Sequence, residues 1–367
     1  MTYRFDEIAI NSTAKKKPVE SDKFHYVGLE HIDSGSFEIT RWGADVAPVG
    51  EKLIMQKGDV LFGKRRAYQR KVAIAPFDGI FSAHGMVLRP KEDVICKEFF
   101  PFFLSSNQFM DTAIRISVGG LSPTINWKDL QKQEFELPSI EEQRVLAEKL
   151  WAAYELKEAY KKMIAATDDM VKSQFIEMFG NPVANNKGWS TMAIKQVAPE
   201  EPSRERQTGT VWILNLDMIE SHTGKIIDKV YDEDTNLLSV APFDEGNVLY
   251  SKLRPYLNKV VIPKGKGYAT TELVPLRPNQ DYLNLTFFSY LLRGDDFVTY
   301  ANTISSGTKM PRMPLNDLRN FQCILPPMEE QLKFEKVAEQ ADKSKFELQQ
   351  AIDKIDKVMK SLINDIK

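Results

Sequence analysis

The segment GDVLFGKRRAYQRKVAI, at residues 58–74, returns 188 residues later as GNVLYSKLRPYLNKVVI, at residues 246–262. Nine of these seventeen positions are identical, and the same offset aligns EEQ at residues 141–143 with EEQ at residues 329–331. A repeat of this length is a whole domain, because solenoid units are only about 20–50 residues long. We therefore predict two similar domains in one chain, an arrangement that suits a ligand with two similar halves.

The bulk composition is that of an ordinary globular protein, with 367 residues of which 43% are hydrophobic and 27% charged. This length has room for two or three domains. No apolar run approaches the roughly 18 residues of a membrane span, and the first residues do not resemble a signal peptide. Cys96 and Cys323 are the only cysteines and have no CxxC spacing, so we expect a reducing cytoplasm and no zinc site.

The net charge of −2 argues against a uniformly basic coat for nucleic acid, but the charges are sorted along the chain. The first copy of the repeated segment places five positive side chains within eight residues, namely Lys64, Arg65, Arg66, Arg70 and Lys71. The second copy places three in the matching stretch, namely Lys252, Arg254 and Lys259. Local basic segments of this kind allow DNA binding by a chain whose net charge is near zero.

Each repeat consists of a mixed front followed by a long helical tail. In the first front, residues 1–138, β-branched and aromatic runs predict strands at residues 60–62, 72–74 and 86–88, and a helix is expected near residues 99–114. Its tail, residues 139–180, begins with a capping box of Ser139 and Glu142 and ends at a Gly-Asn-Pro stop. The second front spans residues 181–327 and its tail residues 328–367. The predicted fold class is α+β, with two similar mixed domains separated by two long helices. The phenylalanines expected in the core are Phe99, Phe100, Phe102 and Phe103, with Phe287 and Phe288 as their repeat equivalents.

The two tails carry seam residues at alternating spacings of four and three, which is typical of a coiled coil. Each stripe needs a partner, and we predict that the two tails pair with each other as a coiled coil. About 40 helical residues would extend roughly 60 Å at 1.5 Å per residue. The alternative is that each helix packs on its own front. The predicted seam comprises Tyr160, Ile164, Thr167 and Val171 in the first tail, and Leu348, Ile352, Ile355, Met359, Leu362 and Ile366 in the second.

A search for catalytic motifs finds no set that recurs in both fronts. The four histidines, at positions 25, 31, 84 and 222, have no metal-ligand spacing, and neither glycine-rich phosphate motif is present. The chain also lacks the Asn/Asp-Pro-Pro-aromatic motif of adenine methylation. Acidic residues are plentiful, so an acidic nuclease site stays open as an alternative. A repeat that keeps its basic segment without a catalytic set favours a binding protein, so we predict no catalytic residue, metal or cofactor in this chain.

The repeated basic segments are the candidate nucleic-acid interface, because Lys and Arg pair with phosphates and Tyr adds a hydroxyl donor or an apolar face. Positions that differ between the copies would let the two domains read two different short sequences. The alternatives are a solvated hairpin whose tyrosine packs into the core, and ordinary drift of a surface loop. The differing pairs include Arg65 with Leu253, His84 with Glu272, Leu121 with Lys309, and Thr124 with Arg312. The predicted DNA-binding residues are Lys64, Arg65, Arg66, Tyr68, Arg70, Lys71, Lys252, Arg254, Tyr256, Asn258, Lys259, Lys309 and Arg312.

These features together resemble the specificity subunit of type I restriction–modification systems, in which two variable domains alternate with two similar long helices. The repeated segments resemble the family's G-D-[VI]-L-[FY]-S-[KR]-x-R-P-Y-x-x-K-x-x-[VI] block, from which the first copy departs at Gly63 and Ala67. LPSIEEQ at residues 137–143 and LPPMEEQ at residues 325–331 resemble the family's helix start, and SQFIEMFGNP at residues 173–182 resembles its helix end. The resemblance covers nearly the whole chain.

The resemblance implies that each front is an α/β target-recognition domain for one half of a split DNA site. It also implies that the two helices form an antiparallel, pseudo-twofold coiled coil that acts as a ruler between the halves. It also implies two modification (methyltransferase) subunits that methylate adenine at N6 with S-adenosylmethionine. A further, optional pair of restriction subunits, acting as motor and nuclease, would use ATP and Mg²⁺. The chain itself would then be the non-catalytic DNA-specificity component of the complex. The rival hypotheses are a self-sufficient DNA-modifying enzyme, disfavoured by the missing motifs, and a coiled-coil interaction scaffold without DNA specificity.

Overall fold

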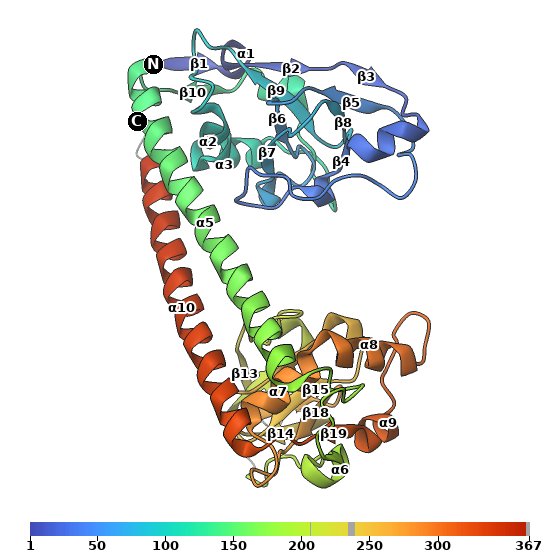
Figure 1. Cartoon of the computed structure of the whole chain (residues 1–367). Helices are drawn as coiled ribbons and strands as arrows, with labels where there is room; N and C mark the ends of the chain where they lie inside the picture. The colour runs from blue at the N-terminus through green and yellow to red at the C-terminus, as the bar shows by residue number, and fades with distance from the viewer. Residues whose placement is uncertain (206, 234–238, 365–367) are drawn as a thin grey trace. The chain divides into compact units, whose positions relative to one another are not determined.

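A computed structural model describes residues 1–205, 207–233 and 239–364 of the chain and divides it into two units. The first contains Met1–Lys161 and Gln349–Lys367, and the second contains Lys162–Leu348. Each unit combines a front of short strands and helices with segments of both long helices (Figure 1). The predicted fold class is confirmed: two similar mixed domains and two long helices.

Short strands form the front of the first unit. In one antiparallel sheet the order is β2 (Ala9–Ser12), β9 (Met86–Pro90), β6 (Val60–Phe62) and β7 (Val72–Ile74). In a second sheet the order is β3 (Lys15–Lys16), β5 (Lys52–Met55), β8 (Gly79–Phe81) and β4 (Tyr26–Val27), with β4 and β8 parallel. β1 (Thr2–Arg4) pairs with β10 (Glu134–Glu136). The strands expected at residues 60–62, 72–74 and 86–88 are confirmed as β6, β7 and β9.

Four helices and three 3-10 turns complete this front. The helices are α1 (Phe5–Ile8), α2 (Phe100–Ser105), α3 (Asn107–Arg115) and α4 (Trp127–Leu130), and the 3-10 turns are η1 (Glu20–His25), η2 (Leu29–His31) and η3 (Ala67–Gln69). The expected helical region near residues 99–114 is therefore two helices, separated at Ser106, which caps α3 by accepting a hydrogen bond from the Phe109 amide. The phenylalanines of α2 and its start are fully buried, which confirms their place in the core.

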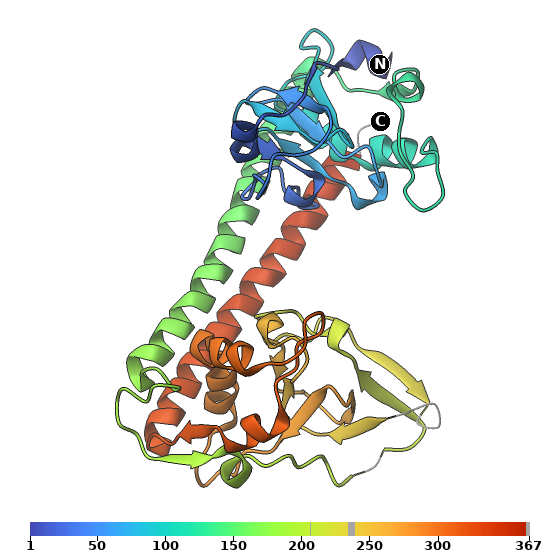
Figure 2. The same ribbon diagram turned by 90° about the vertical axis from the view of Figure 1, so that its right-hand side faces the viewer.

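The second unit repeats this plan (Figure 2). β15 (Val248–Ser251) lies between β16 (Val260–Val261) and β18 (Leu273–Leu276), as β6 lies between β7 and β9. A second sheet has the order β13 (Val230–Glu233), β12 (Thr210–Leu214), β17 (Gly267–Thr270) and β14 (Val240–Phe243), with β12 and β17 parallel. β11 (Thr191–Ala193) pairs with β19 (Gln322–Ile324). The described residues of this unit also form α6 (Ile194–Val197), α7 (Leu285–Arg293), α8 (Asp295–Ile304), α9 (Leu315–Asn320), η4 (Leu216–Met218) and η6 (Pro255–Leu257).

The two long helices are α5 (Ile140–Phe179) and α10 (Met328–Asn364). The capping box expected at the start of α5 is present, because the Ser139 amide donates to the Glu142 carboxylate over 2.8 Å and the Glu142 amide donates to Ser139 Oγ over 3.3 Å. Residues 365–367, which include the predicted seam residue Ile366, lie outside the part of the chain that the structure describes.

A buried glutamine fastens each long helix to the front that precedes it. Gln143 Oε1 accepts from the Cys96 amide over 2.8 Å, and its Nε2 donates to the carbonyls of Val94 and Pro138. Gln331 makes the same three bonds 188 residues later, accepting from the Asn284 amide over 2.8 Å and donating to the carbonyls of Tyr282 and Pro326. Both glutamines are 0% exposed. The repeated EEQ sequence therefore ends in a residue that fixes where the helix leaves its domain.

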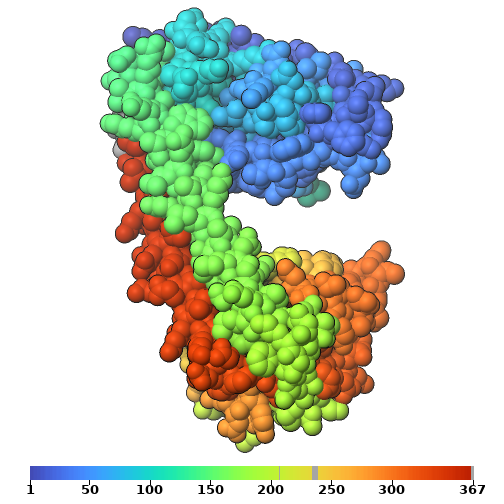
Figure 3. Space-filling model, viewed as in Figure 1, coloured from blue at the N-terminus to red at the C-terminus, as the bar shows by residue number. Residues whose placement is uncertain are grey.

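The two long helices also pack against each other within each unit. In the first unit the start of α5 and the end of α10 lie side by side (Figure 3), and Met359 joins the same core as Leu150 and Tyr154. Lys157 Nζ there binds Asp356 Oδ1 over 2.6 Å. In the second unit Lys345 Nζ binds Asp168 Oδ1 over 2.6 Å and Asp342 Oδ1 over 2.8 Å. Since the lysines are 188 residues apart and so are Asp168 and Asp356, the two ion pairs are copies of one contact.

The predicted seam residues differ in how much of their surface is buried. Val171, Ile352 and Met359 are buried. Tyr160, Ile164, Thr167, Leu348, Ile355 and Leu362 are half-buried. Thr167 Oγ1 donates to the Met163 carbonyl of its own helix over 2.8 Å. The apolar pattern does not include Lys157 and Lys345, yet their side chains are only 10% and 7% exposed. The helix contact therefore contains buried charges that an apolar pattern cannot reveal.

Candidate nucleic-acid interface

The basic turns, residues 64–71 and 252–259, share an unusual backbone. In each, a short 3-10 helix is flanked by two residues with left-handed φ angles: Arg66 (56°) and Arg70 (51°) in the first turn, Arg254 (49°) and Asn258 (47°) in the second. Such angles are uncommon for residues other than glycine and persist only where the surrounding structure enforces them. The departures of the first copy at Gly63 and Ala67 leave this geometry intact, because the Gly63 amide binds the Lys71 carbonyl over 2.9 Å as the Ser251 amide binds that of Lys259 over 3.0 Å.

Each basic turn lies against a loop from the far end of its front. These glycine loops, residues 117–124 and 305–312, turn at Gly119 and Gly307, whose φ angles are 114° and 104°. The Arg66 amide donates to the Pro123 carbonyl over 2.7 Å, and the Arg254 amide donates to that of Pro311 over 2.7 Å. The turn and the loop therefore form one surface in each unit, although about 50 residues of sequence separate them.

Several side chains of this surface point to solvent. Tyr68 is 54% exposed and Tyr256 is 45% exposed, so the alternative that these tyrosines pack into the core is wrong. Arg66 and Lys309 are also exposed. Exposed apolar side chains accompany them in the glycine loops, namely Val118 and Leu121 in the first and Met310 in the second. Each surface therefore offers cations for phosphates beside apolar groups and hydroxyls for base edges.

Four of the predicted DNA-binding residues are instead bonded inside the fold. Lys71 Nζ donates to the Leu29 carbonyl at the start of η2, and Lys259 Nζ donates to the Leu216 carbonyl at the start of η4, both over 2.6 Å. Arg70 binds Asn107 Oδ1 over 2.7 Å. Asn258, 3% exposed, donates to the Arg293 carbonyl over 2.8 Å. These side chains hold the shape of the basic turns, and a contact of any of them with DNA stays a prediction.

Additional lysines make the first unit's surface more basic than the turn alone. Burial lowers the pKa of the half-buried Lys64, and the charge of nearby Lys15 lowers it further. Burial also lowers the pKa of His84, with smaller contributions from Arg65, Lys64 and Lys52. Lys15 and Lys52 lie on β3 and β5, outside the repeated segment, so the comparison of the two copies misses them. The Lys15-Lys16-Lys17 run is the sequence signal that could have found the first of them.

The second unit's surface carries an ion pair at the corresponding place. Arg312 contacts the Glu272 carboxylate through Nε at 3.1 and 3.3 Å and through Nη2 at 2.9 Å. Lys252 is half-buried and Lys309 is exposed. Arg254 is half-buried, and its Nε has no hydrogen-bond partner among the described residues. The two surfaces therefore share a backbone plan but differ in charge.

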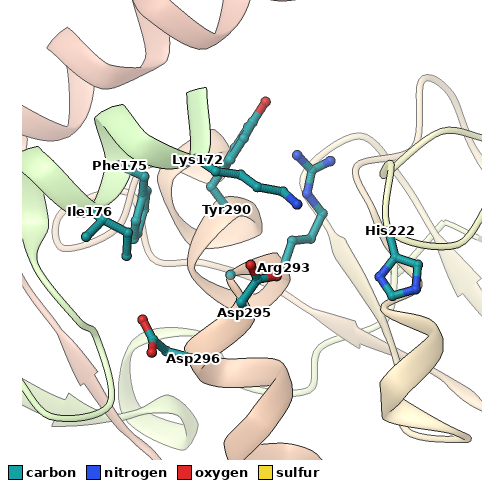
Figure 4. A pocket seen from close by; sticks show the side chains of 9 residues that line it. Lys172, Phe175, Ile176, His222, Tyr290, Arg293, Asp295 and Asp296 are labelled. Atoms are coloured by element: carbon teal, nitrogen blue, oxygen red, sulfur yellow. The ribbon is translucent and has the colours of Figure 1, made fainter. Parts of the chain in front are cut away.

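One pocket in each unit lies at a repeat-equivalent place beside a long helix. The second unit's pocket, of about 160 Å³, is lined by Lys172 and Phe175 of α5 and by Arg293 and Asp295 at the α7–α8 junction (Figure 4). The first unit's pocket, of about 270 Å³, has Lys360 and Ile363 at the positions of Lys172 and Phe175, and Ser105 and Asn107 at those of Arg293 and Asp295. The lysine recurs while the arginine and the aspartate do not.

No group of three or more His, Cys, Asp or Glu side chains within residues 1–205, 207–233 and 239–364 is arranged to hold a metal ion. Over the same residues, no helix is both long and apolar enough to cross a membrane.

Comparisons with known proteins identify the family. The family model described as the type I restriction modification DNA specificity domain matches the chain twice, at residues 8–165 and 186–358. The chain is 24% identical to the type I restriction enzyme EcoDI specificity subunit of Escherichia coli over 373 residues, covering 89% of this chain and 78% of the relative. Its fold resembles that of the S subunit of the type I restriction–modification system of M. genitalium, with a TM-score of 0.53, 12% identity, and coverage of 100% of this chain and 95% of that one.

A second similar structure comes from a study of complex assembly and conformational transition in a type I restriction–modification system. Its TM-score is 0.55 at 19% identity, with coverage of 99% of this chain and 96% of that one. Specificity subunits of this family are non-catalytic and carry no cofactor. The two matches of the family model cover most of the sequence, and this chain belongs to the family of type I restriction–modification DNA specificity subunits.

Proposed function

We propose that each basic turn and its glycine loop bind one half of a split DNA target, with one half read by each domain. The observation that carries this proposal is the repeated surface itself, in which an exposed tyrosine and basic side chains lie beside a loop whose residues differ between the copies. Cations repeated in both domains suit phosphate contacts, which position a protein on DNA without reading sequence. The differing residues suit contacts to base edges, which do read sequence.

The proposal is tested by exchanging one domain. Residues 1–138 are replaced by the matching segment of a specificity subunit that has another target, and the chimera is produced together with its modification subunits. Mapping methylated adenines across a genome should then show that one half of the target changes while the other half and the overall arrangement stay. The reciprocal exchange of residues 181–327 should change the opposite half. A change of both halves by either exchange would show that the domains do not read independently.

We further propose that two modification subunits dock on the long helices and supply adenine-N6 methylation with S-adenosylmethionine. Restriction subunits that use ATP and Mg²⁺ would complete the complex, which would act in the cytoplasm. The support is that α5 and α10 leave large apolar side chains exposed, including Val145 and Leu156 in the first unit and Met163, Met170 and Phe346 in the second. Exposed apolar groups on a helix favour association with a partner. Native mass spectrometry of the co-purified complex should give two modification subunits per chain, and a single subunit would contradict the proposal.

The rival scaffold function predicts no affinity for DNA. Filter binding of mixed-sequence duplex by the full chain at low salt separates the two functions, because phosphate contacts are strongest there. Retention of the duplex that weakens steeply as salt is added supports the proposed function. An absence of binding by the chain and by its complex with modification subunits would favour a scaffold.

A further inference from the structure

Three positions meet at the centre of each surface. In the first unit Arg65 forms a β-bridge with Thr124, and its amide donates to the His84 carbonyl over 3.2 Å. In the second unit Leu253 and Arg312 form the same bridge. There the Lys252 amide donates to the Glu272 carbonyl over 3.1 Å. The basic turn, the glycine loop and the segment just before β9 or β18, which holds His84 or Glu272, therefore meet in a cluster that occurs in both domains.

Each cluster contains an arginine, but a different segment supplies it in each unit. In the first unit it is Arg65 of the basic turn, and the glycine loop supplies the short Thr124. In the second unit the turn supplies Leu253, and the loop supplies Arg312. The third position holds a partner for the arginine in both cases. Arg65 contacts His84 Nε2 at 3.4 Å and Ser122 Oγ at 3.1 Å, and Arg312 binds Glu272. Each domain thus places one arginine with a bonded guanidinium in the equivalent cluster, from different segments of the chain.

The contacts of Arg312 determine which donors remain. Glu272 engages Nε and Nη2, which form one edge of the planar guanidinium. Within the described part of the chain, no hydrogen bond engages the edge formed by Nη1 and the second hydrogen of Nη2. The side chain is 46% exposed. Two parallel N–H donors on a rigid plane match the O6 and N7 acceptors of guanine in the major groove. A carboxylate that fixes the opposite edge limits the rotation of the plane and favours a single orientation.

We infer that Arg312, held in position by Glu272, reads a guanine in the half-site bound by the second domain, and that Arg65 is its counterpart in the first. This inference rests on the proposed function, since it needs each domain to face DNA. Glu272 is a positioning residue in this account, because it acts through Arg312. The exchange of the arginine between turn and loop gives the two domains different approaches to their half-sites while each keeps one guanine contact.

The test uses the full chain and selection of bound sequences from randomised duplexes at one salt concentration. Arg312→Ala should reduce the preference for guanine at one position of one half-site by about tenfold to a hundredfold. Arg312→Lys should keep general affinity and lose that preference, because an ammonium lacks the planar fork. Glu272→Gln should lower the preference at the same position and nowhere else. Arg65→Ala should act on the other half-site.

The matched control is a second arginine–glutamate pair in the same unit. Arg319 Nε and Nη2 bind Glu200 at 2.7 and 3.2 Å. The Arg319 side chain is 44% exposed, a fraction similar to the 46% of Arg312, but Arg319 lies on α9, outside the basic turn and the glycine loop. Arg319→Ala and Glu200→Gln should leave the selected sequence unchanged. Thermal unfolding of every variant identifies any that fail to fold, and Arg312→Lys then provides the measurement.

The possible outcomes separate the two levels of the proposal. If the unaltered chain selects no split sequence, the proposed function is wrong. If it selects one and Arg312→Ala or Arg312→Lys leaves the guanine preference intact, the inference is wrong while the proposed function stands. A uniform loss of affinity for all sequences would make Arg312 a phosphate contact and would also overturn the inference. Loss of guanine preference at one position, with the Arg319 controls unchanged, supports it.

Discussion

Replacing Gln331 by alanine should weaken the attachment of the start of α10 to the second domain and lower the stability of that domain. Its side chain accepts one amide hydrogen bond and donates two more to carbonyls, at 2.8–2.9 Å, and it is fully buried. A buried donor that loses its partner costs about 1–3 kcal/mol, and an unpaired carbonyl costs less because it has a second lone pair. The space left by the missing amide adds a cavity cost of about 1 kcal/mol or more. We therefore expect a loss of about 3–5 kcal/mol in the free energy of unfolding.

Urea unfolding measures the total loss, and hydrogen exchange with mass spectrometry locates it. At a typical slope of about 2 kcal/mol per molar urea, the transition of the second unit should move down by about 2 M. Exchange should rise at the start of α10 and around the Asn284 amide, while the first unit keeps its protection. Gln340→Ala is the matched control, since Gln340 is an exposed glutamine on the same helix and its loss should cost less than about 0.5 kcal/mol.

The equivalent change Gln143→Ala should produce the same loss in the first unit. The reasoning would be refuted if Gln331→Ala cost less than about 1 kcal/mol, or if it increased exchange equally in both units. The first result would mean that water or a shifted side chain replaces the three bonds. The second would mean that the glutamine does not act within its own domain.

Three further predictions concern Lys345, His84 and Arg254. Lys345→Ala should lower the free energy of unfolding of the second unit by about 1–3 kcal/mol, as measured by urea unfolding. This loss is smaller than the usual value of about 3–5 kcal/mol for a broken buried ion pair, because the remaining carboxylate of Asp168 is partly exposed to solvent. A loss as large as that of a fully buried pair would contradict this. The pKa of His84 is lower in the folded state than its ordinary value of 6.5, so the unfolded state binds the proton more readily. The free energy of unfolding should therefore fall as the pH drops below 6.5. His84→Gln should reduce this pH dependence, as measured by thermal unfolding at several pH values. Arg254→Ala should weaken binding to all duplexes alike and reduce the salt dependence by about one ion, as measured by fluorescence anisotropy. A loss of affinity limited to duplexes that differ at one base pair would instead show that Arg254 contacts a base.

The strands of the repeated segment and the start of α5 could be predicted from sequence because their signals are local. β6 is an apolar run between Asp59 and Gly63, and β7 is an apolar run that starts after Lys71. The Ser139 cap is a four-residue pattern that ends at Glu142. The pairing of basic turn and glycine loop is not local, because it joins Arg66 to Pro123. The comparison of the two copies nevertheless marked Arg312 and Glu272 as changed positions. Only the structure shows that the two changes belong to a single ion pair.

The register of the long helices was harder to predict for a physical reason. A hydrophobic pattern treats lysine as a solvent-facing residue, whereas Lys157 and Lys345 are buried by pairing with aspartates from the other helix. The hydrophobic pattern therefore predicts Tyr160 and Thr167 as seam residues, although both are only half-buried. A prediction from charge alone fails in a similar way for Lys71 and Lys259. Their positive charge predicts contacts with DNA, whereas their Nζ atoms donate to carbonyls within the fold.

The lysines of β3 and β5 in the first domain have a kinetic consequence. Lys15 and Lys52 occupy positions where the second domain has Ser203 and Val240, and the second domain neutralises Arg312 with Glu272. Long-range attraction to a polyanion depends on unneutralised charge, whereas discrimination depends on oriented donors. The surface of the amino-terminal domain should therefore contribute more to the salt dependence of DNA association than that of the carboxy-terminal domain.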